Sequence, residues 1–447
     1  MNPHAVFKAY DIRGRSDTGE LDANLYELVG NAFARLVEAP RIAVGRDCRS
    51  SSSEFFAALA KGINDAGSDV IDLGEVPTDV VYYYSGAQGV PGAIITASHN
   101  PAEYNGLKLC RSGAAPIGAE TGLVEIKNSV LARNRVTSIL SGTTHSVDPV
   151  SDYVNHLFSV VDPSTIGPLR VAVDGGNGMV GIAIDDVFAR IEASLQGLYL
   201  TPDGTFPNHP ADPLVPENLV DLVELVETGN FDLGVAFDGD ADRAFFLDDT
   251  GAPLSGSTVT SLIARRLLAE NPGATVVHNL ITSHAVPEIV EESGGIPVRT
   301  RVGHSYIKQI MADTDAVFGG EHSGHYYFRD NFRADSGMMA MLTILSILSE
   351  DGRRFSEIRR DVERYAASGE INFEVTDVAG ALHQVEESVY NASIDHLDGL
   401  TVDYGDEWFN IRPSNTEPLL RLNVEAPTPA RVDEIVSRVS RILEEEQ

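Results

Sequence analysis

Cysteine and long apolar runs are scarce in this chain of 447 residues. Cys48 and Cys110 are its only cysteines, and they form no close-spaced motif, which is typical of a protein from a reducing compartment. No apolar run approaches the roughly 18 residues that a membrane-spanning helix needs. Residues 1–8 also lack the basic and apolar parts of a secretory signal. We therefore expect a cytoplasmic protein without a membrane span.

Positive charge is scarce as well. Lysine and arginine total 33 against 66 aspartates and glutamates, which gives a formal net charge of −33. A surface this acidic repels polyanions, so neither nucleic acid nor an anionic membrane is expected as the main partner. Of only five lysines, Lys8, Lys108 and Lys308 lie in or beside the polar segments described below. Rare cations gathered at loops indicate a local anion site, with chance placement as the alternative.

The chain is too long for one hydrophobic core, since domains average about 150 residues. Strand and helix patterns alternate three times, over residues 1–145, 146–254 and 255–368, and a polar, turn-rich stretch at 141–149 separates the first two. Residues 369–447 have a different pattern of short strands and helices. This order predicts three similar mixed-sheet α/β domains followed by a smaller C-terminal α+β domain.

Ser98 lies in a short polar loop that follows an apolar strand expected at about 93–96. The loop reads Thr96-Ala-Ser-His-Asn-Pro101, so His99 is its neighbour in sequence. Loops at the ends of buried strands are where α/β proteins often place reactive groups. The alternative is a plain turn, because serine, asparagine and proline all favour turns.

Three further local structures are expected. Ser51 to Glu54 have the pattern that caps a helix through its first turn. Asn105-Gly106 predicts a turn within the strand that returns after the serine loop. The glycine-rich Gly175–Gly178 is expected to open a helix, and close packing explains these glycines better than phosphate binding does.

Asp238, Asp240 and Asp242 form the strongest chemical signal in the chain. Three carboxylates at alternate positions repel one another unless a cation joins them, and Mg²⁺ takes oxygen ligands of this kind. A calcium EF-hand does not fit, because strands flank the loop and Arg243 stands where that motif needs glycine. Arg243 suits an anionic group beside the metal. A purely structural aspartate-rich turn is the alternative.

Two more polar loops are expected to bind a ligand. Arg412-Pro-Ser-Asn-Thr-Glu-Pro418 combines a guanidinium, hydroxyls and an amide between two strands, and its backbone N–H groups could bind an anion with help from Arg421. A polar hairpin is the alternative there. Glu321-His-Ser-Gly-His325 lacks the spacing of a zinc protease motif. Glu321 and Ser323 suit sugar hydroxyls, although a lone histidine in such a loop is more often structural.

Together these segments resemble the α-D-phosphohexomutase superfamily, over the whole chain and in the order of that family. They are the opening Phe7–Gly14 and the loops 96–101, 238–243, 321–325 and 412–418. The form Glu-His-Ser-Gly-His is similar to the phosphomannomutase/phosphoglucomutase branch, whereas the glucosamine branch usually has Gln after the Glu. The first branch often has a basic residue near the strand end after Val277, where this chain has His278-Asn-Leu-Ile-Thr-Ser283. The resemblance implies four domains around a central cleft.

The resemblance also implies roles for individual residues. Ser98 would carry a phosphoryl group as phosphoserine, and its oxygen would join Asp238, Asp240 and Asp242 around Mg²⁺. The other expected catalytic residues are Arg13, His99, Lys108, His304 and His325, and which of them is the general acid or base stays open. The expected substrate-binding residues are Arg243, Gly303, Lys308, Glu321, Ser323, Arg412, Ser414, Asn415, Thr416 and Arg421.

The implied activity is that of a phosphomannomutase, which interconverts mannose 1-phosphate and mannose 6-phosphate and also accepts glucose phosphates. The route passes through phosphoserine and a hexose 1,6-bisphosphate, which also serves as activator. Phosphoglucomutase and phosphoglucosamine mutase are alternatives within the superfamily. A serine-dependent metal phosphatase would have less need of the C-terminal anion loop, and a non-catalytic sugar-phosphate sensor would have no need of Ser98. Hexose phosphates are thus the expected partners of a monomer or homodimer.

Overall fold

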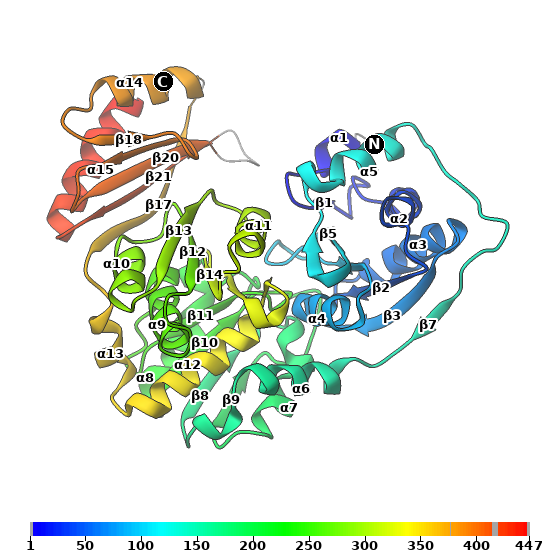
Figure 1. Ribbon diagram of the computed structural model, residues 1–447, viewed down its shortest axis with the longest axis horizontal. Helices are drawn as coiled ribbons and strands as arrows, with labels where there is room; N and C mark the ends of the chain where they lie inside the picture. Colours follow the sequence, from blue (N-terminus) through cyan, green and yellow to red (C-terminus); the bar gives the residue numbers. More distant parts are fainter. Residues whose placement is uncertain (1–2, 376, 414–418, 445–447) are drawn as a thin grey trace.

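The computed structural model describes residues 3–375, 377–413 and 419–444. Four β-sheets follow one another along the chain. In Figure 1 the first unit (blue and cyan) lies opposite the third (light green and yellow), the second lies below both, and the last (orange and red) lies above the third. Among the described helices, none is long and apolar enough to cross a bilayer.

The first unit is built on a seven-stranded mixed sheet. Its main path contains β1 (Ile12–Arg15), β5 (Tyr104–Arg111), β4 (Gly92–Ile95), β2 (Arg41–Arg46), β3 (Asp69–Glu75) and β7 (Thr144–Ser146), and β6 (Ala115–Pro116) pairs with β5. Strands β2, β3 and β4 pair in parallel, whereas β5 is antiparallel to β4 and β1. All four residues of β4 are buried, as its unbroken apolar run predicts. The helices are α1 (Pro3–Val6), α2 (Ala23–Val37), α3 (Ser52–Asp65), α4 (Thr78–Gln88) and α5 (Leu123–Leu131).

The second and third units have the same type of mixed sheet. The second contains, in spatial order, β11 (Ala244–Leu247), β10 (Leu233–Phe237), β8 (Arg170–Asp174) and β9 (Ser194–Leu198), with α6 (Val150–Val160), α7 (Ile184–Phe188) and α8 (Val220–Gly229). The third contains β13 (Ile296–Thr300), β12 (Thr275–Asn279), β14 (Phe318–Gly320), β15 (Tyr326–Phe328) and β16 (Ala334–Asp335), with α9 (Gly256–Glu270), α10 (Ala285–Glu292), α11 (His304–Thr314), α12 (Gly337–Asp351) and α13 (Phe355–Ile358).

The C-terminal unit has a fully antiparallel sheet. Its spatial order is β17 (Ala366–Glu374), β21 (Leu419–Ala426), β20 (Trp408–Pro413), β19 (Leu400–Asp403) and β18 (Ser393–Asp395), with α14 (Val378–Glu387) and α15 (Pro429–Glu444). This unit therefore has the expected α+β character. The fold class predicted from the sequence is confirmed.

Hydrophobic packing unites the first three units and leaves the fourth apart. One continuous core joins residues of all three mixed sheets, such as Ile94, Val173 and Phe318. The C-terminal unit has its own core, and a small cluster of Leu280, Ile281 and Trp408 joins it to the third unit. The hydrophobic core of the last unit is thus separate from the main core.

Three local predictions are wrong in detail. Asn105 and Gly106 lie inside β5, where a Cβ on Gly106 would come within 2.3 Å of the carbonyl oxygen of Ile12, so close strand packing explains this glycine and no turn is formed. The Ser51 side chain makes no capping hydrogen bond and accepts one from Asn105 Nδ2 at 2.8 Å. Gly175–Gly178 is followed by a 3₁₀ turn at Met179–Ile182 before α7 begins.

Candidate active site

The loop that carries Ser98 has a constrained backbone. Ser98 follows β4 by three residues, has a φ of +52° and is only 2% exposed. Its N–H donates to Thr96 Oγ1 at 2.9 Å. A serine in the left-handed region costs about 1 kcal/mol or more, so surrounding contacts must hold the loop in place.

Arg49 provides most of those contacts, and the sequence analysis missed it. Its fully buried guanidinium donates to four carbonyl oxygens of the loop, those of Ser98 (2.8 Å), Asn100 (2.6 Å), Pro101 (2.6 Å) and Tyr104 (3.0 Å). Asp47 pairs with the Nε of Arg49 at 3.0 Å. A signal for this role was present, because Arg49 lies just after the end of β2, and β2 is the neighbour in the sheet of β4, which leads into the serine loop.

The loop between β10 and β11 brings the three aspartates together. Potential ligand atoms of Asp238, Asp240 and Asp242 all lie within 4.8 Å of one another, and all three side chains are buried. Oδ1 of Asp240 and Oδ1 of Asp242 are buried without a hydrogen-bond partner among the described residues. Buried carboxylate oxygens without partners are costly, and a cation would satisfy them. The donor set therefore fits a hard divalent cation such as Mg²⁺.

The serine loop and the aspartate loop touch through Ser98. The Ser98 hydroxyl donates to Asp238 Oδ2 at 2.7 Å, and Arg243 Nη2 donates to Ser98 Oγ at 2.9 Å. Arg243 also pairs with Asp238, Nε to Oδ2, at 3.0 Å, and contacts His99 Nδ1. Burial and the nearby Arg243 lower the pKa of His99, so its imidazole is neutral at pH 7. A predicted nucleophile, three predicted metal ligands and a predicted phosphate-binding arginine thus share one site.

Lys108 reaches the same carboxylates from β5. Its Nζ donates to Asp240 Oδ2 at 2.7 Å and to Asp242 Oδ2 at 2.5 Å. Burial alone would lower the pKa of Lys108, but the two aspartates more than compensate and raise it. Burial likewise opposes ionisation of Asp240 and Asp242, and Lys108 nevertheless holds their pKa values below the usual range. Lys108 is therefore a permanent cation beside the triad.

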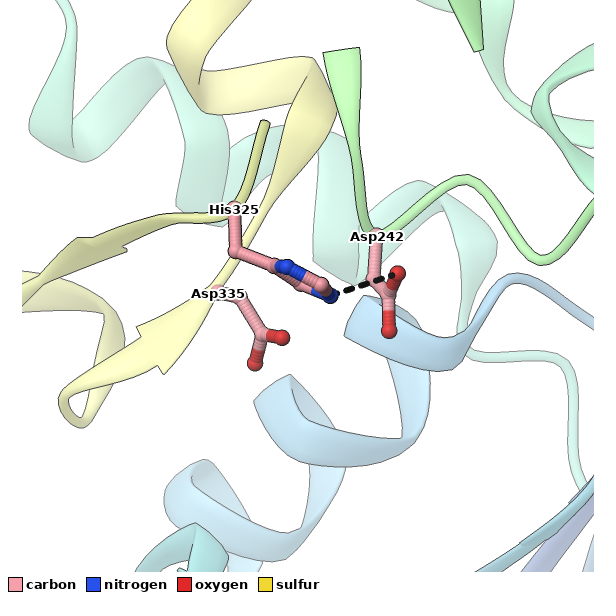
Figure 2. Close-up of side chains that lie close together, drawn as sticks. All are labelled: Asp242, His325 and Asp335. Atoms are coloured by element: carbon pink, nitrogen blue, oxygen red, sulfur yellow. Dashed lines mark ion pairs between the residues drawn. The ribbon is translucent and has the colours of Figure 1, made fainter. Parts of the chain in front are cut away.

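His325 connects the aspartate loop to the loop at 321–325. Figure 2 shows its ring pointing from the third unit toward Asp242, with Nε2 3.7 Å from Asp242 Oδ1. Its Nδ1 lies 2.9 Å from Ser323 Oγ. Burial lowers the pKa of His325 despite the nearby Asp242, so the ring is neutral near pH 7. Asp335, also drawn in Figure 2, pairs with Lys308 Nζ at 2.6 Å, so Lys308 is engaged with a protein carboxylate here.

Glu321 is held in one orientation by three donors. Tyr327 Oη donates to it at 2.7 Å, Asn279 Nδ2 at 3.3 Å and the Gly303 N–H at 3.2 Å. These donors come from β15, β12 and the turn before α11, which explains why no local motif revealed them.

Residues of the first and third units also meet near Glu321. Tyr10 of the N-terminal segment donates to the carbonyl oxygen of Val302 at 3.2 Å and packs edge-on against His304. Burial lowers the pKa of His304 to about 3, which makes it a neutral side chain. Arg13 on β1 donates to Asn100 Oδ1 at 2.6 Å and therefore contacts the serine loop.

The C-terminal unit contributes Arg412 and Arg421 from neighbouring strands. Burial lowers the pKa of Arg412, and the charges of Glu370 and, more weakly, Asp398 and Glu321 oppose that shift. Three further predicted phosphate-binding residues lie outside the described residues: Ser414, Asn415 and Thr416.

Comparison with known proteins agrees with this arrangement over the whole chain. Residues 4–135, 151–251 and 255–365 match α/β/α domains I, II and III of phosphoglucomutase/phosphomannomutase, and residues 370–442 match its C-terminal domain. A phosphohexose mutase of Xanthomonas campestris is 40% identical over 424 residues, which cover 94% of either chain. A phosphomannomutase of Escherichia coli is 38% identical over 437 residues, 95% of this chain and 96% of the relative.

A solved structure supports the same assignment. The crystal structure of a phosphoglucomutase/phosphomannomutase family protein from Burkholderia thailandensis superposes with a TM-score of 0.90 at 30% sequence identity, covering 99% of this chain and 97% of that one. The fold and the matched domains define an isomerase that acts as an intramolecular phosphotransferase. The chain belongs to the phosphoglucomutase/phosphomannomutase family of the phosphohexomutase superfamily, as the sequence motifs predicted.

Proposed function

We propose that the protein is an Mg²⁺-dependent phosphomannomutase that also accepts glucose phosphates and works through phosphoserine at Ser98. The observation that carries this proposal is the Ser98 hydroxyl, 2.7 Å from the first of three buried aspartates. Relatives at 38% identity that are named phosphomannomutases support mannose as the sugar. Phosphoglucomutase and phosphoglucosamine mutase activity remain the alternatives within the superfamily.

Mg²⁺ would be held by Asp238, Asp240 and Asp242 together with the oxygen of modified Ser98. When bound, the ion supplies positive charge that offsets the charge of the phosphoryl group during transfer. Arg243, which donates to Ser98 Oγ, would bind oxygens of the same phosphoryl group. Lys108 adds a permanent positive charge next to Asp240 and Asp242.

Phosphoserine would act first as a donor, because a free serine hydroxyl is a weak nucleophile. The bond between Ser98 Oγ and phosphorus breaks while a sugar hydroxyl oxygen bonds to phosphorus. The sugar hydroxyl proton passes to a base, and Ser98 Oγ takes up a proton to restore the hydroxyl that donates to Asp238. His325 is suited to act as this base, because its ring is neutral and lies between two carboxylates. Its Nδ1 lies 3.6 Å from Glu321 Oε2, and its Nε2 lies 3.7 Å from Asp242 Oδ1. Glu321 and Ser323 would hold the sugar hydroxyls in line.

The product of this first transfer is a hexose 1,6-bisphosphate. Its other phosphoryl group must return to Ser98, so the sugar has to turn end over end between two transfers. Arg412 and Arg421, with Ser414, Asn415 and Thr416, would bind whichever phosphate is not reacting. Added hexose bisphosphate would act as activator by phosphorylating an empty Ser98.

The phosphoserine step can be tested by intact-protein mass spectrometry after incubation with glucose 1,6-bisphosphate and Mg²⁺. We expect the native protein to gain one phosphoryl group and Ser98→Ala to gain none. Ser146→Ala, an exposed serine on β7, is the control and should be modified like the native protein. Phosphorylation that persists in Ser98→Ala would reject Ser98 as the carrier.

A further inference from the structure

Arg412 and Arg421 form an unusual pair because they carry the same charge at directly opposite positions. Strands β20 and β21 are antiparallel, and their register places Arg412 across from Arg421. Residues opposed in this way have Cβ atoms about 5 Å apart, and like charges there repel each other. The Arg412 side chain is only 5% exposed, so water screens this repulsion poorly. The pair needs an anion between its guanidinium groups.

Glu370 supplies a carboxylate at this position. It lies on β17, which pairs with β21 on the side away from β20. Asn423 is its direct cross-strand partner, so Arg421 is its diagonal neighbour on the same face. Arg412 Nη2 lies 3.0 Å from Glu370 Oε2, and Arg421 Nη1 lies 3.2 Å from Glu370 Oε1. One carboxylate therefore bridges both guanidinium groups, one oxygen to each.

The backbone of β17 aims Glu370 at the arginines. The register between β17 and β21 shifts between Ala367 and Glu370, so Ser368 and Gly369 bulge out of the ladder. Gly369 has a φ of +68°, which glycine adopts without strain, and the Val424 N–H donates to Ser368 Oγ at 3.0 Å. Glu370 is the first residue after this bulge and lies close to the point where the chain enters the C-terminal unit. Bulges beside functional sites often redirect a side chain in this way.

We infer that Glu370 is an internal counter-ion of the phosphate site and competes with the substrate phosphate for the guanidinium N–H groups of Arg412 and Arg421. The inference rests on the proposed function, which assigns both arginines to the non-reacting phosphate. A phosphate entering the site meets guanidinium groups whose charge Glu370 already partly neutralises. Binding is thereby weakened enough for the bisphosphate intermediate to leave and turn. Glu370 is thus a positioning residue that tunes affinity and turnover together.

Glu370→Gln tests the inference, because it removes the charge and keeps the shape and an acceptor oxygen. Binding of mannose 6-phosphate and mannose 1-phosphate is measured by calorimetry in a Ser98→Ala background, where no transfer occurs. We expect Glu370→Gln to bind both ligands about tenfold more tightly, as expected when a competing charge is removed from a partly buried arginine pair. With Ser98 present, the variant should have a lower KM and a lower kcat, because the intermediate is released more slowly.

Two control variants make the result specific. Glu434→Gln removes an exposed carboxylate that pairs with Arg431 at 2.6 Å in the same unit, and it should change neither affinity nor turnover. Glu370→Asp keeps the charge but reaches the arginines less well, so it should raise the affinity only modestly and by less than Glu370→Gln does. The same modest rise is the expected result if Glu370→Gln fails to fold.

Unchanged or weaker binding by folded Glu370→Gln would overturn the inference. That result is expected if the Glu370 carboxylate only holds the two arginine side chains in position. Arg412→Gln separates this failure from failure of the proposed function. If Arg412→Gln weakens binding and Glu370→Gln does not strengthen it, only the counter-ion is wrong. If Arg412→Gln leaves binding unchanged, the phosphate site itself is misassigned and the inference falls with it.

Discussion

A serine with a positive φ depends on the residues that hold its loop. Ser98 stays in the left-handed region because Arg49, itself fixed by Asp47, donates to four carbonyl oxygens around it. The sequence showed which residues have reactive groups, because carboxylates and hydroxyls in strand-end loops are recognisable. The roles of Arg49 and Glu370 were not predicted. They arise from contacts with residues about 40 to 50 positions away in the sequence, so no short motif contains both partners.

Arg49→Lys is expected to lower kcat by about ten- to a hundredfold, because an ammonium group cannot reach four carbonyl oxygens and the Ser98 hydroxyl moves. KM for the hexose phosphate should change little, since Arg49 contacts the serine loop and not the sugar loop. Steady-state kinetics measure both constants. Arg46→Lys, which affects a partly buried ion pair between Arg46 on β2 and Asp72 on β3, is the control. A rise in KM with unchanged kcat would contradict this role.

At the scale of elements, the site forms where loops at the ends of β4 and β10 approach each other. The sequence predicted the strand before the serine loop and the strand that returns after it, because buried strands have distinct apolar runs. It misplaced a turn at Asn105-Gly106, because a glycine required by close strand packing looks the same in sequence as a glycine required by a turn. The glycines at 175–178 show the same ambiguity. A Cβ on Gly178 would come within 2.7 Å of the Gly239 carbonyl oxygen, so this segment packs against the aspartate loop.

Gly239 controls how closely the serine and aspartate loops approach. A Cβ at this position would lie 2.4 Å from the Ser98 carbonyl oxygen, a backbone atom that cannot move without shifting the loop. We expect Gly239→Ala to lower kcat about a hundredfold, because displacements near 1 Å between reacting groups have effects of this size. Gly167→Ala, where a Cβ meets only ordinary contacts, is the matched control. Equal turnover in both variants would show that the two loops need not touch.

At the scale of the molecule, three units share a core, whereas the fourth has its own core and is joined to the third by a small hydrophobic cluster and by polar contacts. Asp79 marks the junction of the first three, because it accepts hydrogen bonds from Tyr153 (2.5 Å) in the second unit and Ser336 (2.8 Å) in the third. Burial raises its pKa to about 7. This carboxyl group therefore remains protonated in the folded protein at pH values where it would be ionised in the unfolded chain.

Asp79→Asn should change how stability depends on pH. Between about pH 4 and pH 7 the unfolded chain ionises Asp79 and the folded protein does not, so the native protein loses stability over this window as pH rises. The loss of stability that Asp79 causes is absent below pH 4 and constant above pH 7. Thermal unfolding should show the Tm of Asp79→Asn rising relative to the native protein from pH 4.5 to 7.5. A Tm difference that does not vary with pH would show that Asp79 keeps an ordinary pKa.

The separate core of the C-terminal unit suggests how an intermediate could turn within the site. We expect this unit to rotate away from the third between the two transfers. Arg299→Cys and Asp395→Cys, which replace an ion pair across that contact, can be joined by a short bismaleimide in a Cys48→Ser background. The linked protein should form hexose bisphosphate once and release little mannose 6-phosphate. Equal steady-state turnover before and after linking would exclude the rotation.

The central claim is that Ser98 and the aspartate triad move a phosphoryl group from one end of a hexose to the other. Phosphorus NMR of mannose 1-phosphate with the protein, Mg²⁺ and a trace of glucose 1,6-bisphosphate tests it most directly. We expect the signal of mannose 1-phosphate to be replaced by that of mannose 6-phosphate, and conversion to stop with EDTA or in Ser98→Ala. Growth of inorganic phosphate would indicate a phosphatase. A spectrum unchanged with mannose, glucose and glucosamine phosphates would contradict mutase activity altogether.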